Sequence, residues 1–279
     1  MKISIIIPTY NRAKFIEKAI ESVLNQTSNS YELVVCDNNS TDNTQEIVKK
    51  FESDKIKYIK FSKTLQVSEN WERALDYISG DFFIILGDDD YLMPNFIEEI
   101  TNLLEDKKDA DFIIVDSTNY SQFDPVGGMQ NLLFIHNYEM DIKEIDPIEV
   151  ANSYQTINVF KKSFQIAQLH PSVFVVNTTI MNKIRKKYNG YFKNFFPDWI
   201  ANVLLGINSK KAYLISKPLV IIGGFDNKYY CYNNSKDSYF LLKSLAEKEK
   251  KEILNIILNL PYLKSFMMNL KNIHIWLRD

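Results

Sequence analysis

DFFIILGDDDYLMP, residues 81–94, carries five consecutive apolar side chains and then, after one glycine, three adjacent aspartates. An apolar run of this kind, Phe82 to Leu86, predicts a strand buried on both faces of a parallel sheet. Pro94 and apolar residues at helical spacing follow, so we expect the strand to lead into a helix. The aspartates would then lie at the carboxyl end of a central strand, which is where open α/β sheets bind ligands.

The three aspartates, Asp88, Asp89 and Asp90, repel one another when all are ionised. A divalent cation removes this repulsion, and hard oxygen ligands suit Mg²⁺ or Mn²⁺. Mg²⁺ typically takes one or two carboxylates and completes its shell with water and phosphate oxygens. The motif therefore has two interpretations, a metal site that carries a diphosphate and a solvated acidic turn that caps the next helix.

The composition indicates a globular protein with a substantial core. The chain has 279 residues, 46% of them hydrophobic, and a net charge of −2, which gives no sign of a nucleic-acid-binding surface. Two cysteines are too few for a disulfide framework, and the apolar run near the start is too short for a signal peptide. We therefore expect a cytoplasmic protein with reduced thiols and no nucleic-acid partner.

Strands and helices alternate along the first part of the chain. In addition to the strand at 82–86, strands are expected at 3–7, 31–36, 56–61 and 112–115, with helices between them. This alternation predicts a mainly parallel sheet with right-handed crossovers. No glycine-rich phosphate loop follows the first strand, so a metal would have to hold any phosphate.

The periodicity weakens after the first half. Residues 116–168 are irregular apart from a helix start at Asp146-Pro147, and long irregular segments often form lids or binding loops. The other expected elements are strands at 172–177, 213–215 and 219–222 and helices that begin at Thr178 and Asp198.

Residues 236–279 predict two helices separated by Pro261, with a net charge of +3. One interpretation is a helical pair that packs on the domain. The other is a surface that touches a membrane or a partner, which would make the protein peripheral at the inner face of the cell membrane.

Four blocks of the sequence follow one another at a distinctive spacing: SIIIPTYNR from residue 4, AIESVLNQT from 19, ELVVCDNNSTDNT from 32 and NWERALDYISGDFFIILGDDDYLMP from 70. Together with HPSVF (170–174) and PDWIANVLL (197–205), which match more loosely, they resemble family 2 glycosyltransferases of the GT-A fold. The resemblance implies an α/β, Rossmann-like and mainly parallel sheet flanked by helices, with a C-terminal helical extension. Residues 1–115 would form the nucleotide-sugar-binding half, 116–235 the acceptor-binding half of the same domain, and 236–279 the C-terminal helices.

The resemblance also implies an activity. Family members of this kind move a sugar from a nucleoside-diphosphate sugar, commonly a UDP-sugar, to a hydroxyl group with inversion at the anomeric carbon. The acceptor would be a saccharide or a lipid-linked saccharide of surface polysaccharide synthesis, and the cofactor Mn²⁺ or Mg²⁺. Two alternatives stay open, a sugar-nucleotide-binding module without activity and a nucleotidyltransferase.

By position in the family pattern, five residues would bind the nucleotide. Pro8, Thr9 and Tyr10 would line the pocket, Asp37 would accept a hydrogen bond from the base, and Asp88 would face the ribose or the metal. We expect Asp37 to be free for this task, because other polar residues in the turn after it are available to cap the next helix.

The remaining predicted site residues are carboxylates. Asp89 would be the main metal ligand, with Asp90 as a second one, and Asp198 falls where the family places its catalytic carboxylate. The frame of the metal motif is uncertain because this chain has Gly87 where many relatives carry an aspartate. Asp198 also has a simpler interpretation as the N-cap of its helix.

Four other positions depart from the family pattern or carry weaker signals. Asn38 and Asn39 replace the second and third residues of a common Asp-Asp-Gly-Ser turn, and Asn39 is expected to adopt the left-handed conformation of the glycine. Arg12 would either approach the diphosphate or be an exposed residue at a helix start, and we favour the exposed residue. His170 is interpreted as structural rather than ligand-binding.

Overall fold

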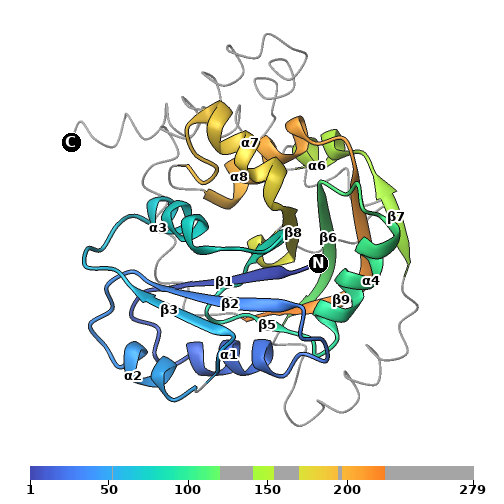
Figure 1. Ribbon diagram of the computed structural model, residues 1–279. Coiled ribbons are helices and arrows are strands. Elements are labelled where there is room, and N and C mark those ends of the chain that lie inside the picture. Colours follow the sequence, from blue (N-terminus) through green and yellow to red (C-terminus); the bar gives the residue numbers. More distant parts are fainter. Residues whose placement is uncertain (52, 120–140, 154–169, 194–196, 224–279) are drawn as a thin grey trace, which may run out of the picture.

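The computed structural model describes residues 1–51, 53–119, 141–153, 170–193 and 197–223. Within these residues the chain forms one nine-stranded sheet with helices against both of its faces (Figure 1). Strands from the predicted nucleotide-binding and acceptor-binding halves share this sheet.

Four parallel strands form one half of the sheet. Every residue of β1 and β4 is buried, because helices cover both faces of the sheet here, as the unbroken apolar runs predicted. The edge strand β3 is only partly buried. The four strands are β1 (Ile3–Thr9), β2 (Tyr31–Asp37), β3 (Ile56–Lys60) and β4 (Phe82–Ile85), in the spatial order β3-β2-β1-β4.

The other half of the sheet is mixed. β8 runs antiparallel between β4 and β6, β9 is parallel to β6, and β5 and β7 are antiparallel to β9. Of the nine described strands, six therefore run in one direction and three against them. The five strands added here are β5 (Tyr91–Leu92), β6 (Phe112–Asn119), β7 (Ile142–Ile145), β8 (Phe174–Asn177) and β9 (Ala212–Ile222).

β9 is a single strand, so the prediction of two short strands at 213–215 and 219–222 was wrong. Pro218 interrupts the apolar pattern, but its register partner Asp116 lies at an irregularity of β6 that accommodates the break. β5 and β7 were not predicted, because β5 has only two residues and β7 is mostly exposed.

The helices lie on both sides of the parallel strands. Figure 1 shows α1 and α2 on one side and α3 on the other, with α7 and α8 beside one another above α3. The apolar residues of α4 at helical spacing are all buried, as predicted. The described helices are α1 (Ile16–Leu24), α2 (Thr44–Lys49), α3 (Val67–Ala74), α4 (Phe96–Asp106), α6 (Pro147–Ser153), α7 (Thr178–Tyr188) and α8 (Pro197–Asn208), with 3₁₀ turns η1 (Leu75–Tyr77) and η4 (Pro171–Val173).

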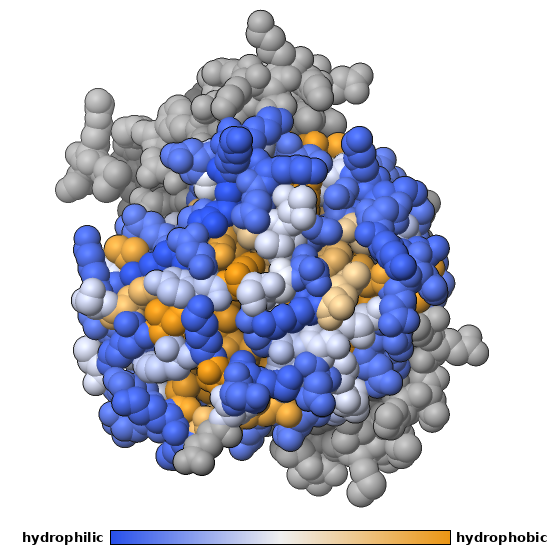
Figure 2. Space-filling model, in the orientation of Figure 1, coloured by the Kyte–Doolittle hydropathy of each residue, from blue (hydrophilic) through white to orange (hydrophobic). Residues whose placement is uncertain are grey.

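The face seen in Figure 2 is covered largely by polar and charged side chains, and apolar side chains show between them near the middle of the view. None of the helices in the described ranges combines the length and the apolar character that a membrane crossing requires. The two helices predicted over residues 236–279 lie outside the described residues.

A polar network joins the amino ends of β1 and β2 to the loop before β4. Glu32 accepts hydrogen bonds from Lys2 Nζ (2.8 Å) and Ser4 Oγ (2.6 Å), and from Ser79 N (2.6 Å) and Oγ (2.8 Å). Ser4 Oγ in turn accepts from Gly80 N. A Cβ atom at Gly80 would lie 2.7 Å from Ser4 N, so this glycine permits the loop before β4 to approach the backbone of β1 closely.

The network makes the stability of the fold depend on pH. Partial burial alone would raise the pKa of Glu32, but the hydrogen bonds from Lys2, Ser4 and Ser79 outweigh it and lower that pKa to about 2. Because the folded-state value is depressed, the ionised carboxylate stabilises the fold at neutral pH, and this contribution is lost as the pH falls from about 4.5 towards 2. Glu32→Gln should lower the free energy of unfolding by about 2 kcal/mol at pH 7, after allowance for solvent screening.

Urea unfolding at several pH values tests this expectation. The difference between wild type and Glu32→Gln should shrink as the pH is lowered from 5 to 3. Glu17→Gln, on the exposed face of α1, is the control and should stay within about 0.5 kcal/mol of wild type. A difference that does not change with pH would assign the effect to packing instead of charge.

Candidate active site

The carboxyl ends of β1, β2 and β4 meet at one edge of the sheet. Thr9 is the register partner of Asp37, and Leu86 N donates to Ile6 O, so the three strands end side by side. Thr9 Oγ1 donates to Asp88 Oδ2 at 2.8 Å. The aspartate turn therefore lies where the apolar strand predicted it, next to the ends of two neighbouring strands.

Arg12 lies between two of the three aspartates. Its Nε is 3.0 Å from Asp88 Oδ1 and its Nη2 is 2.5 Å from Asp89 Oδ2. The guanidinium also lies 4.3 Å from the centre of the Phe15 ring. The interpretation of Arg12 as an exposed residue was wrong, because only 19% of its side chain is exposed.

Burial and charge act together on the protonation of this turn. Burial raises the pKa of Asp88 to about 6, although the Arg12 charge and a hydrogen bond from Thr9 oppose the shift. Burial also raises the pKa of Asp90. It alone would lower the pKa of Arg12, but the neighbouring carboxylates outweigh it and raise that pKa, so the guanidinium keeps its charge.

Asp90 is buried, like Asp88, but its hydrogen bonds tie it to different segments of the chain. Its Oδ1 accepts from Gly223 N at 2.9 Å, and its Oδ2 accepts a short hydrogen bond from Ser172 Oγ and lies 3.3 Å from His170 Nδ1. Ser172 Oγ also accepts from Gly87 N. Both oxygens of the predicted second metal ligand thus have partners within the protein, and Asp90 fastens the turn to the segment before β8 and to the end of β9.

Gly223 packs its backbone against the turn. A Cβ atom at this position would lie 1.5 Å from the carbonyl oxygen of Asp89, a distance that requires the backbone to move. Gly223→Ala should therefore displace Asp89, lower the stability by about 1–3 kcal/mol and weaken nucleotide binding in the presence of Mn²⁺ at least tenfold.

Gly206→Ala is a matched control for this prediction. A Cβ atom at Gly206 would lie 2.5 Å from Pro147 O, so it should cost comparable stability, but at the contact of α8 with α6. Melting temperature and calorimetric UDP affinity, measured on both variants, separate the effects. Equal UDP affinities in the two variants would show that Gly223 has only a structural role.

Asp37 is fully buried, and both of its oxygens accept hydrogen bonds. Ser40 N donates to Oδ1 at 2.7 Å and the Tyr58 hydroxyl donates to Oδ2 at 2.6 Å. The expectation that Asp37 is left free was therefore wrong. The expected left-handed conformation of Asn39 is confirmed, with φ of 69°.

Asn38 is a structural residue that the sequence analysis missed. Its amide donates to Leu65 O and accepts from Leu65 N, both at 2.9 Å, and its oxygen also accepts from Arg73 Nη2 at 2.6 Å. A carboxylate at this position could not donate to Leu65 O, so the amide is suited to the loop before α3. No signal in the sequence reveals this, because the partners lie far along the chain.

The loops after β1 and β2 are bonded to each other. Asn11 adopts a left-handed conformation with φ of 54°, its N–H donates to Ser40 Oγ and its side chain accepts from Thr41 N. Pro8 is buried within β1, whereas Tyr10 is 44% exposed. Tyr10, in the loop after β1, is therefore exposed to solvent at the edge of the sheet where the strands end.

Asp198 lies on another segment, half-buried in the first turn of α8, which contacts α6, α7 and α3. Glu72 of α3 holds the chain that leads towards this turn. Its Oε2 accepts from Tyr191 N and Phe192 N, both at 2.8 Å, and its Oε1 accepts from Arg185 Nε at 2.7 Å. The catalytic role of Asp198 stays a prediction.

The donor set of the turn suits a hard divalent cation with phosphate oxygens in its shell. No group of three or more acidic, histidine or cysteine side chains in the described residues could by itself hold a metal ion. Asp88 and Asp89 provide two neighbouring carboxylates, and the positively charged guanidinium of Arg12 already lies between them. This fits Mg²⁺ or Mn²⁺, which take one or two carboxylates and complete the shell with water and phosphate.

The site residues on β1, β2 and β4 fall within one stretch that matches a known family. The family model described as "Glycosyl transferase family 2" matches residues 4–183, well over half of the chain. The chain belongs to glycosyl transferase family 2. The resemblance inferred from the sequence blocks is thereby confirmed.

Relatives and solved structures agree with this family 2 assignment. A Campylobacter jejuni GalNAc(5)-diNAcBac-PP-undecaprenol beta-1,3-glucosyltransferase is 40% identical over 102 residues, which cover 36% of this chain and 33% of that one. The chain spans well under half the length of the curated relatives it matches.

Two solved structures show the fold. S. aureus TarS in complex with UDP-GlcNAc has a TM-score of 0.70 at 20% identity, covering 93% of this chain and 72% of that one. The mannosyltransferase PcManGT from Pyrobaculum calidifontis, with GDP-Man and Mn²⁺, has a TM-score of 0.56 at 14% identity, covering 91% and 68%. The predicted GT-A fold is confirmed for the described part of this family 2 chain.

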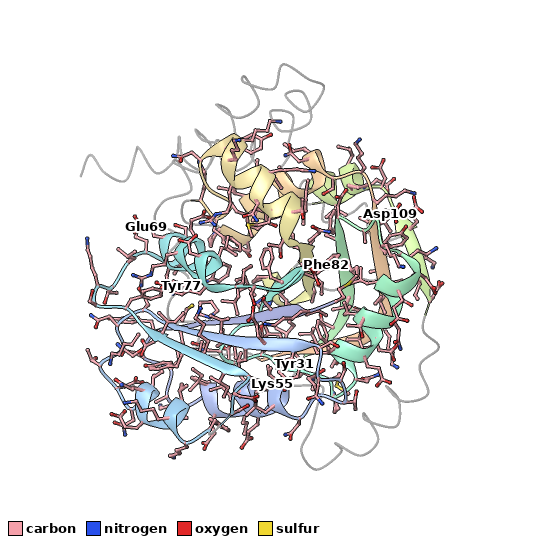
Figure 3. The ribbon with its side chains drawn as sticks, viewed as in Figure 1. Tyr31, Lys55, Glu69, Tyr77, Phe82 and Asp109 are labelled. Atoms are coloured by element: carbon pink, nitrogen blue, oxygen red, sulfur yellow. The ribbon has the colours of Figure 1, made fainter. Side chains whose placement is uncertain are left out.

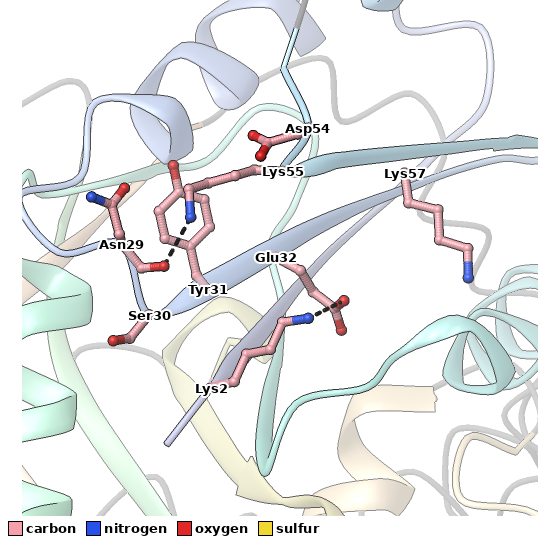
Figure 4. A pocket seen from close by; sticks show the side chains of 8 residues that line it. All are labelled: Lys2, Asn29, Ser30, Tyr31, Glu32, Asp54, Lys55 and Lys57. Atoms are coloured by element: carbon pink, nitrogen blue, oxygen red, sulfur yellow. Dashed lines mark hydrogen bonds and ion pairs between the residues drawn. The ribbon is translucent and has the colours of Figure 1, made fainter.

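A cavity of about 480 Å³ lies at the opposite edge of the sheet, at the amino ends of the parallel strands. Figure 4 shows Lys2 paired with Glu32 and Lys55 with the carbonyl of Asn29, and Lys57 donates to Tyr77 O, which lies outside the residues drawn. Lys55 also lies over the Tyr31 ring at 4.8 Å, and Figure 3 shows both residues at this edge. The aspartate turn lies at the other edge of the sheet, so none of the predicted site residues lines this cavity.

Proposed function

We propose that this chain is an inverting, metal-dependent glycosyltransferase that moves a sugar from a nucleoside-diphosphate sugar, a UDP-sugar, to a hydroxyl of a saccharide or lipid-linked acceptor in surface polysaccharide synthesis. The observation that carries the proposal is the pair Asp88 and Asp89, held beside Thr9 where β1 and β4 end. Open α/β sheets bind ligands at such strand ends.

The named relatives support the choice of donor and acceptor. The Campylobacter relative is named for glucosyl transfer onto a saccharide carried by undecaprenol diphosphate, and the TarS structure contains UDP-GlcNAc. We propose the same classes for this chain, a UDP-sugar as donor and a lipid-linked saccharide as acceptor.

The strand-end residues would bind and orient the donor. Asp89, with Asp88 beside it, would hold Mn²⁺ or Mg²⁺, and a bound metal offsets the negative charge that develops on a departing diphosphate. Thr9 fixes the orientation of Asp88, and the exposed ring of Tyr10 offers a surface for the nucleobase. Asp90 would hold the aspartate turn in place through its buried hydrogen bonds from Gly223 and Ser172, instead of binding the metal directly.

We propose that Asp37 still accepts a hydrogen bond from the nucleobase, although both of its oxygens already accept one within the protein. A carboxylate oxygen has a second lone pair, so a base N–H would share an oxygen with Ser40 or Tyr58 instead of finding one free. The contact also requires the buried carboxylate to become accessible from the donor side.

Asp198 would act on the acceptor. Inversion requires the acceptor hydroxyl to attack the anomeric carbon from the face opposite the diphosphate, and a hydroxyl is a weak nucleophile until a base takes its proton. Asp198 lies in the first turn of α8, on a different segment from the aspartate turn. Its carboxylate would therefore approach the acceptor hydroxyl from another side than the aspartates that hold the donor.

A single assay separates the proposal from its alternatives. The purified protein is incubated with a panel of sugar nucleotides and Mn²⁺, with and without lipid-linked saccharides, and the released nucleotide is identified. We expect release of nucleoside diphosphate and a product of inverted configuration. A binding module would bind nucleotide without release, and a nucleotidyltransferase would exchange pyrophosphate instead.

A further inference from the structure

The guanidinium of Arg12 bridges the two carboxylates that the proposed function assigns to the metal. One nitrogen contacts Asp88 Oδ1 at 3.0 Å and another contacts Asp89 Oδ2 at 2.5 Å. Within the described ranges, no other cationic side chain forms an ion pair with either aspartate. The charge of the turn is therefore balanced from inside the protein.

The backbone at Arg12 is fixed, but its side chain is not locked by other hydrogen bonds. Arg12 O accepts from Phe15 N (3.0 Å) and Ile16 N (3.2 Å), which fastens the turn that leads into α1. The described contacts of the guanidinium are the two carboxylates and the face of the Phe15 ring. If the carboxylates bind another cation, the side chain loses its ion pairs while its backbone stays in place.

We propose that Arg12 is an exchangeable counter-ion, which neutralises Asp88 and Asp89 in the free protein and moves to the diphosphate of the donor when a metal ion takes the carboxylates. The inference rests on the proposed metal-dependent function. A guanidinium and a divalent cation repel each other, so they compete for the same pair of carboxylates. The planar fork of Arg12 matches phosphate oxygens as well as carboxylate oxygens, and the diphosphate is the nearest new anion.

This exchange makes metal and nucleotide binding depend on each other. A metal ion alone must displace Arg12 without offering the guanidinium a new partner, so it should bind weakly. Metal and nucleotide together replace every lost ion pair, so each should raise the affinity for the other by the same factor. An alternative is that Arg12 only fastens the loop before α1, and that role predicts no such coupling.

The test measures Mn²⁺ affinity by electron paramagnetic resonance, with and without UDP, on the full chain. For Arg12→Gln we expect Mn²⁺ to bind about tenfold more tightly than wild type in the absence of UDP, because the competing cation is gone. UDP should then improve Mn²⁺ affinity far less than it does in wild type. Lys14→Gln, at an exposed position in the same loop, removes a charge of the same sign and should behave as wild type.

Arg12→Lys keeps the test informative if the glutamine variant unfolds. A lysine retains the charge but not the fork, so its Mn²⁺ affinity and its coupling to UDP should fall between those of wild type and Arg12→Gln. Equal Mn²⁺ affinities in wild type and both variants would overturn the exchange and leave the metal site standing. Absence of Mn²⁺ binding in all of them, with UDP present, would overturn the metal-dependent function and the exchange together.

Discussion

Asp89→Asn is expected to lower sugar transfer by about a thousandfold while leaving the melting temperature almost unchanged. Metal ions supply several kcal/mol of charge stabilisation in such reactions, and that energy corresponds to roughly three orders of magnitude in rate. Asp89 is 26% exposed at its side chain, and its ion pair is with Arg12, which retains Asp88 when Asp89 is neutralised. The fold therefore depends little on the Asp89 charge.

Asp90→Asn is the matched comparison for this prediction. Asp90 is 1% exposed and accepts hydrogen bonds from Ser172 and Gly223, so its substitution should lower the melting temperature by several degrees. Calorimetry with UDP, with and without Mn²⁺, gives the second measurement. We expect Asp89→Asn to abolish the gain in UDP affinity that Mn²⁺ provides. Equal UDP affinity of wild type and variant in the presence of Mn²⁺ would contradict the assignment of Asp89 to the metal.

The elements that the sequence predicted are those with local signals. β1 and β4 are continuous apolar runs, and α4 repeats its apolar residues at helical spacing, so each element is readable within a few residues. The mixed half depends on pairing between distant segments. β9 pairs with β5, β6 and β7, and neither the short strands nor the continuity across Pro218 has a local signal.

The same division applies to the site. Three consecutive aspartates are indistinguishable in sequence, yet their partners come from residues about 80 to 130 positions away along the chain. Asp88 accepts hydrogen bonds from Thr9 and Arg12 at the carboxyl end of β1, whereas Asp90 accepts them from Ser172 and Gly223. The position of the turn was predictable from the strand before it, but the different environments of its members were not.

Asp198→Asn is expected to lower turnover by about a hundredfold to ten-thousandfold, the usual range for general-base assistance, with donor affinity nearly unchanged. The asparagine keeps the size and the capping ability of the aspartate in the first turn of α8, but it cannot take the proton of the acceptor hydroxyl. The proposed donor site lies at the ends of β1, β2 and β4, so binding of the nucleotide should survive.

α8 begins at Pro197, so Asp198 lies inside the helix and the interpretation of it as the N-cap was wrong. Donor affinity, melting temperature and turnover, measured on the same preparation, distinguish catalysis from a structural role in the first turn. Glu149→Gln, exposed in the first turn of the neighbouring α6, is the control and should match wild type in all three. If Asp198 only stabilises the first turn of α8, the asparagine variant should turn over normally for each folded molecule. If it is the base, turnover should fall with acceptor present, because removing the proton from the acceptor is the one step in which Asp198 would take part.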